Sequence, residues 1–153
     1  MKAATIAQLK KELQYRSPDQ LLDYCMAMAR FKLECKVLLT YLVFESDNET
    51  AYIQGVKQYL DLEFTQLNTS KYYYIKKGVR KILRQLKRYI RYSKNKETEA
   101  DLLLYFCQKL EAVKPDIFKN KVLTNMYNTQ KRMAKNAVVK LHPDAQLDYK
   151  ELL

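Results

Sequence analysis

A run of basic residues between positions 71 and 96 is the part of this sequence whose residue types and spacing most clearly suggest chemistry. The run holds eleven Lys or Arg residues and no Asp or Glu. Cationic side chains at helical spacing can neutralise a row of phosphates or carboxylates, and such binding weakens with salt. We therefore treat eight of these residues as a candidate polyanion-binding face. They are Lys76, Lys77, Arg80, Lys81, Arg84, Lys87, Arg88 and Arg91.

Three consecutive tyrosines, Tyr72, Tyr73 and Tyr74, open the same segment. Successive residues on a helix point about 100° apart, so the three rings cannot all be buried together. One or two of them are expected to face solvent or a partner, where a ring could stack on a base or pack against a protein. The alternative is that they seal the start of the helix against the preceding helix.

Three interpretations of the basic segment remain open from sequence alone. It could be a solvated face or a docking surface for an acidic protein, a nucleic-acid-binding face, or a helix lying on a membrane surface. The nucleic-acid interpretation would also use Lys131, Arg132, Lys135 and Lys140 of a later helix. The membrane interpretation is the weakest, because the apolar stripe of this helix is needed to cover a strongly apolar helix that follows. We favour docking to an acidic partner, with nucleic acid as the alternative.

Residues for catalysis or metal binding do not form a recognisable set. His142 is the only histidine, and a histidine before Pro143 at a helix end is typical of a cap. The three cysteines lie in apolar surroundings, do not form a C-x-x-C pair and are odd in number, which favours a reducing compartment. We expect a cytoplasmic, non-enzymatic protein without a metal or cofactor, and the oligomeric state is left open.

Charge is distributed unevenly along the chain. The net charge is +11, and residues 71–153 carry twenty Lys or Arg against eight Asp or Glu, whereas residues 1–70 carry eight against nine. No apolar run approaches the ~20 residues that a membrane-spanning helix needs. The second half is therefore expected to meet an acidic or polyanionic partner.

The elements that would position these residues are all predicted to be helical. The chain has only two glycines and three prolines, and it has no Asn-Gly pair of the kind that joins β-strands. Apolar residues recur at spacings of three and four, and Ser17-Pro18-Asp19-Gln20 is typical of a helix start. The expected helices span residues 5–16, 18–44 as one helix or two, 49–67, 71–93, 98–113 and 120–141.

These patterns predict an all-α fold, either a compact bundle or a short stack of six or seven antiparallel helices in a single domain, residues 1–153. Val37–Phe44 is expected to be a buried helix, and Leu102–Cys107 marks a central one because it is apolar on every side. Leu9–Leu13 with Arg16 resembles the start of the small helical modules that bind scaffold-attachment DNA. The glycine and second-helix pattern of those modules does not follow Arg16, so no family is assigned.

Overall fold

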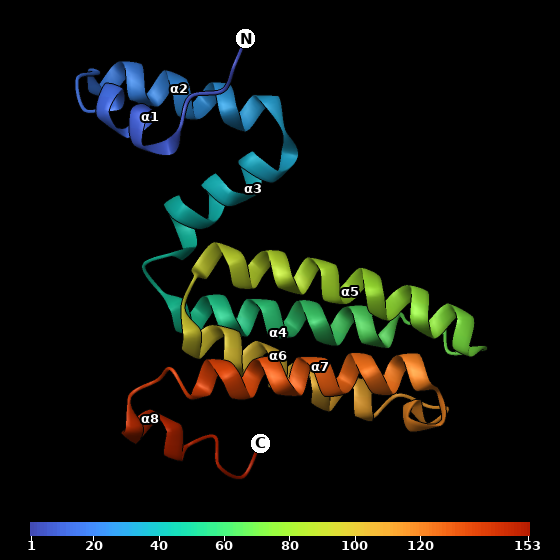
Figure 1. Cartoon of the computed structure of the whole chain (residues 1–153). Coiled ribbons are helices and arrows are strands. Elements are labelled where there is room, and N and C mark those ends of the chain that lie inside the picture. The colour runs from blue at the N-terminus through green and yellow to red at the C-terminus, as the bar shows by residue number, and fades with distance from the viewer. The chain divides into compact units, whose positions relative to one another are not determined.

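The regular secondary structure of this protein is entirely helical in the computed structural model, which describes residues 1–153 (Figure 1). This confirms the predicted all-α class. Seven α-helices have eight residues or more, and three shorter elements complete the chain. The seven are α1 (Ile6–Leu13), α2 (Pro18–Phe31), α3 (Leu33–Thr40), α4 (Glu49–Thr65), α5 (Tyr72–Ser93), α6 (Lys96–Glu111) and α7 (Lys121–Val138). The three are the π-helical turn η1 (Tyr41–Glu45), the 3-10 turn η2 (Ile117–Lys119) and α8 (Pro143–Leu147).

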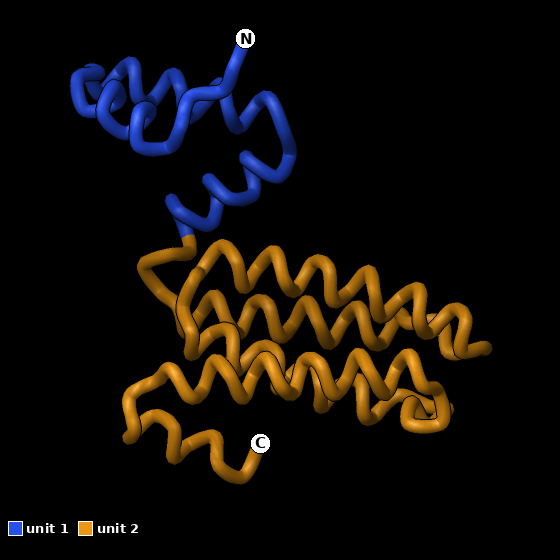
Figure 2. Tube along the Cα trace, viewed as in Figure 1, with its two compact units in different colours: residues 1–44 blue, residues 45–153 orange.

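The chain divides into two compact units, which we call unit 1 (residues 1–44) and unit 2 (residues 45–153) (Figure 2). Unit 1 contains α1, α2 and α3, and unit 2 contains the helices from α4 to α8. A unit defined by contacts is not the same as an independently folding domain, so the single domain expected from the sequence stays a prediction.

Local sequence signals set the helix ends of unit 1. Thr5 and Ser17 cap α1 and α2 in capping boxes, because each side chain accepts from the backbone three residues later and Gln8 or Gln20 reaches back. Lys32 has an extended backbone, with φ −146° and ψ 135°, and it separates α2 from α3. The stretch that could have been one helix is therefore two.

Unit 1 has almost no buried side chains of its own. Tyr41 is the single residue of positions 1–44 in the buried class, and no residue of α1, α2 or α3 is buried. The prediction that Val37–Phe44 forms a buried helix is correct as to the helix and wrong as to burial. Apolar composition favours burial only where another element lies against the helix, and here Val43 and Phe44 remain 57% and 77% exposed.

Unit 2 is built around α6, as its apolar run predicted. Leu102, Leu103, Phe106 and Leu110 have no exposed surface, and α6 packs against α4, α5 and α7. The first turn of α6 also buries Thr98, whose hydroxyl donates to Glu49 of α4 at 2.5 Å. A helix with neighbours on three sides needs apolar side chains over most of its surface, which explains the apolar run Leu102–Cys107.

The C-terminal segment after α7 forms the short helix α8 and contributes one buried side chain to unit 2. His142 caps α8, since its Nδ1 atom accepts from the backbone N–H of Asp144 at 3.3 Å. Tyr149 is buried, whereas Leu147 and Leu152 are 56% and 41% exposed.

Candidate functional site

The position of α5 in unit 2 is fixed by one apolar stripe. Ile75, Val79, Ile82, Leu83 and Leu86 recur every three or four residues and are all buried against α4 and α6. Each such side chain contributes roughly 1.5–3 kcal/mol on burial, so this stripe anchors α5 firmly. Lys94 ends the helix in a left-handed conformation with φ 57°.

The opposite face of α5 is exposed and basic. Lys77, Arg80, Lys81, Arg84 and Arg91 are in the exposed class, and they lie on the side of the helix away from the buried stripe. Lys76 and Lys87 lie at the edges of this face, and they and Arg88 are half-buried. All eight sequence-predicted cations are therefore brought together on one helix, and we call them the α5 basic face.

Most of the α5 basic face has no carboxylate partner within the protein. Lys81 forms a long ion pair with Glu63 of α4, at 3.6 Å, and Arg88 donates to the side-chain oxygen of Gln85 at 3.5 Å. The remaining six cations make no salt bridge. These six are Lys76, Lys77, Arg80, Arg84, Lys87 and Arg91. Their charges repel one another along the helix unless an external anion neutralises them.

The N-terminus of α5 adds to this positive potential. No side chain caps the helix at Lys71, and the first turn contains no acidic residue. The free N–H groups of a helix start carry partial positive charge, which acidic side chains usually complement. The helix dipole therefore adds positive potential at the beginning of α5, and no residue of its first turn neutralises it.

The three tyrosines of this turn have different environments. Tyr72 is half-buried, and its hydroxyl donates to the backbone carbonyl of Asp116 at 2.8 Å. Tyr73 and Tyr74 are 63% and 43% exposed, and their rings contact edge-to-face with centroids 5.3 Å apart. Tyr72 thus ties α5 to the loop before η2, while the other two rings are open to a partner.

A groove lies beside the basic face, between the end of α4 and the first half of α5. Its volume is about 510 Å³. Its lining includes Leu67 and Tyr74, the cations Lys77 and Arg84, and the carboxylate of Glu63. Sequence reasoning missed this groove, because Leu67 approaches α5 only where Gly78 lacks a side chain, and the spacing of those residues along the chain gives no sign of it.

The basic residues of α7 do not extend the α5 basic face. Lys121, Arg132 and Lys135 are exposed, but α7 packs on α6 and η2, whereas α5 packs on α4 and α6. In Figure 1, α4 runs between α5 and α7. Each helix turns its exposed side away from the elements that it packs against, so the two sets of cations lie on different faces of unit 2.

A polar cluster between α4 and α6 is held by internal partners. Lys109 forms an ion pair with Asp61 at 2.5 Å, Tyr105 donates to Asp61 at 2.7 Å, and Lys57 pairs with Asp101 at 3.2 Å. The Lys109 ammonium lowers the pKa of Asp61 below its usual value, chiefly through their hydrogen bond. These groups join two helices and leave no free base or nucleophile.

Residues that could perform catalysis are separate from one another. Burial raises the pKa of the Cys107 thiol to about 12, which keeps it protonated. The one histidine, His142, is engaged in capping α8, and no three His, Cys, Asp or Glu side chains gather as a metal site would require.

None of the helices is both long enough and apolar enough to cross a membrane. No protein-family model, curated protein or solved structure matches this chain. Its function is therefore inferred from its own residues.

Proposed function

We propose that this protein is a non-enzymatic interaction protein that docks an acidic segment of a protein partner on the α5 basic face. The observation that carries the proposal is the set of six cations without a carboxylate partner on one side of a single, well-anchored helix. The backbone of α5 is already ordered before the partner arrives. Binding therefore avoids the entropy cost of ordering the backbone that carries these charges.

Charge on this face supplies steering and register. A row of cations raises the local concentration of an acidic segment and speeds its association, in a salt-dependent way. The 22 residues of α5 span roughly 33 Å. An acidic segment lying along that length can meet Arg80, Arg84 and Arg91 in turn.

The groove beside α5 favours a protein over a nucleic acid. Its Leu67 side chain, which lies in the lining beside Tyr74, suits an apolar side chain of a peptide. The cations of α7 lie on another face and add nothing to a track along α5. Both features support an acidic peptide with an apolar anchor.

Nucleic acid is the alternative, and the exposed rings of Tyr73 and Tyr74 are the observation that favours it. The two ligands are separated by fluorescence anisotropy at ~150 mM salt, where exposed charges more than ~8 Å apart are screened. The probes are a labelled Glu-rich peptide containing one leucine, a single-stranded RNA and a duplex DNA. Tighter binding of the peptide is expected. Tighter binding of RNA or DNA than of the peptide would overturn the proposal.

A further inference from the structure

Exposed apolar side chains are concentrated in unit 1. Sixteen of the 25 large apolar side chains that the chain exposes belong to its first 44 residues. They include Leu22 at 60%, Met28 at 57% and Phe31 at 88% exposure. Scattered exposed leucines are normal on a protein surface, but such a concentration on three short helices is not.

The amount of apolar surface matches one side of a protein interface. Scaled by their exposed fractions, and at ~60–120 Å² of apolar area each, these side chains present on the order of 500–1,000 Å². Summed over all sides of unit 1, this area is comparable with the ~800 Å² that each partner contributes to a standard interface. Unit 1 therefore has the surface that an interface needs and lacks the core that would let it stand alone.

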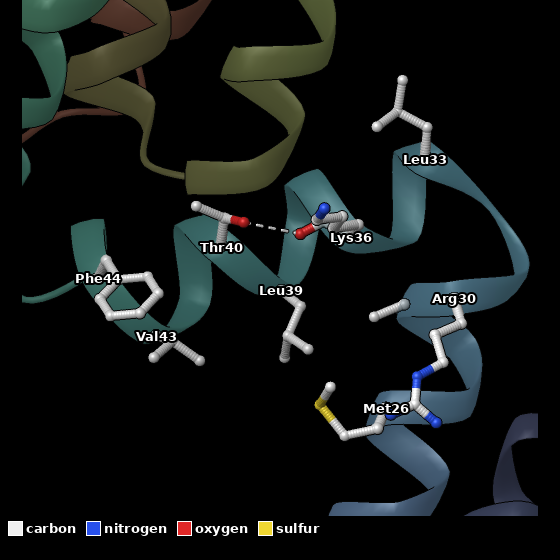
Figure 3. A pocket seen from close by; sticks show the side chains of 9 residues that line it. Met26, Arg30, Leu33, Lys36, Leu39, Thr40, Val43 and Phe44 are labelled. Atoms are coloured by element: carbon white, nitrogen blue, oxygen red, sulfur yellow. Dashed lines mark hydrogen bonds between the residues drawn. The ribbon is translucent and has the colours of Figure 1, made fainter.

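The inner side of the bend between α2 and α3 is open. A groove of about 720 Å³ lies there, lined by Met26, Arg30, Leu39 and Val43 among others. Figure 3 shows Met26 of α2 and Leu39 of α3 pointing toward one another across it, while Leu33 at the bend points away. Nothing in unit 1 fills this space.

The charged residues of α2 indicate what kind of partner covers the apolar surface of unit 1. Asp19, Asp23 and Arg30 are spaced by four and seven residues, so they share one side of the helix, next to the stripe that contains Leu22 and Met26. All three charged residues are exposed and unpaired within the chain. The two aspartates, four residues apart, repel one another until a cation comes between them.

We propose that unit 1 forms a two-fold symmetric homodimer, in which α2 packs antiparallel on α2 of a second copy and Arg30 of each chain lies beside Asp23 of the other. Residues 23 and 30 lie at equal distances on either side of a point next to Met26. A two-fold axis through that point therefore places Asp23 of each chain opposite Arg30 of the other. The surface is self-complementary, as a two-fold interface must be. Leu22 and Met26 form its apolar centre.

Unit 2 does not offer an equivalent surface. All buried apolar residues of the chain except Tyr41 lie in unit 2, which has satisfied its own core. The nine large apolar side chains that it exposes are spread from α4 to the C-terminus. A second unit 1 supplies both the apolar area and the opposite charges, and the proposal is independent of what α5 binds.

The test is sedimentation velocity of the full chain over a hundredfold range of concentration, with Leu22→Asp and a matched control. Leu62→Asp is the control, because Leu62 of α4 is 55% exposed and lies outside unit 1. The mass derived from sedimentation is expected to be twice the 18.2 kDa of one chain for wild type and for the Leu62 variant. For the Leu22 variant it is expected to be 18.2 kDa. Circular dichroism checks that unit 2 stays folded in all three proteins.

A charge exchange tests the antiparallel arrangement itself. Asp23→Arg and Arg30→Asp should each weaken the dimer at least about tenfold, since each places like charges opposite one another twice. The double variant should restore the dimer to within about threefold of wild type, because every contact is again between opposite charges. A wild-type monomer at all concentrations, a dimer that survives Leu22→Asp, an assembly larger than a dimer, or a double variant weaker than either single one would overturn the proposal.

Discussion

Thr98, in the first turn of α6, donates its hydroxyl to the carboxylate of Glu49, in the first turn of α4, at 2.5 Å. Ser93 at the end of α5 donates to the same oxygen, so one carboxylate joins three helices at one end of unit 2. Thr98 is fully buried. Glu49 itself is half-buried and keeps the Ser93 hydroxyl when Thr98 is replaced, so the substitution removes one hydrogen bond to a charged acceptor.

Thr98→Val should therefore lower the free energy of unfolding by about 1–3 kcal/mol, although its shape hardly changes. Urea unfolding followed by circular dichroism measures the difference. Thr65→Val is the matched control, because the Thr65 hydroxyl bonds only to the Asp61 carbonyl on an exposed part of α4. It should change stability by less than about 0.5 kcal/mol. Equal changes in the free energy of unfolding for Thr98→Val and Thr65→Val would show that the hydrogen bond from Thr98 to Glu49 does not stabilise the fold.

The two glycines should respond differently to alanine. Both lie inside helices, where alanine is favoured over glycine by about 1 kcal/mol. An added Cβ at Gly55 meets nothing within 4 Å, whereas at Gly78 it would collide with the Cδ1 atom of Leu67. Gly55→Ala should raise the free energy of unfolding by about 0.5–1 kcal/mol. Gly78→Ala should raise it by clearly less, because Leu67 has to move. Equal gains in thermal unfolding would show that Leu67 does not depend on Gly78.

Acid should weaken the contact between α4 and α6 through Asp61. The hydrogen bond from Lys109 lowers the pKa of Asp61 below 3.8 in the folded protein. The stabilisation is complete above the unfolded-state value and is lost as pH falls through the lower, folded-state value. The pair is half-exposed, so its effect stays below about 1 kcal/mol. Asp61→Asn should reduce the difference in stability between pH 5 and pH 2.5, and an unchanged difference would contradict this origin.

Burial should make Cys107 unreactive in the native protein. Its pKa of about 12 leaves the thiol protonated at pH 8, and only 1% of its surface is exposed. Ellman's reagent should therefore detect the same number of thiols in folded wild type and folded Cys107→Ala. After unfolding in guanidinium, wild type should show one thiol more than the variant. A missing thiol in the folded variant would mean that Cys107 is accessible.

Local signals in the sequence were enough to predict the caps and the faces of single helices. The Ser17 capping box depends on residues three positions apart, and the stripe of α5 repeats within one helix. Relations over longer distances were not readable. Tyr72 bonds to Asp116, which is 44 residues away, and only the tertiary fold brings the two together.

Burial was predicted well where a helix has neighbours and poorly where it has none. The apolar run of α6 is buried by α4, α5 and α7. The similar run Val37–Phe44 is largely exposed, because hydrophobicity states what a segment would gain from burial and not whether something is present to bury it. In the candidate site, sequence placed the cations on one helix, but the groove formed with Leu67 required the structure.

The most direct test of the central claim is to reverse the charge of α5 and of α7 separately. One variant changes Lys77, Arg80, Arg84 and Lys87 to Glu, which leaves the Lys81–Glu63 pair and Arg88 in place. The matched control changes the exposed cations Lys121, Arg132, Lys135 and Lys140 to Glu, which alters the net charge equally.

Binding of the labelled Glu-rich peptide is measured for both variants at ~150 mM salt. The α5 variant should lose binding entirely. The α7 variant should keep its affinity for the peptide to within about tenfold, because it loses only the long-range attraction that the net charge of the protein exerts on the peptide. Equal loss in both variants would mean that net charge attracts the peptide, and it would contradict a docking surface on α5.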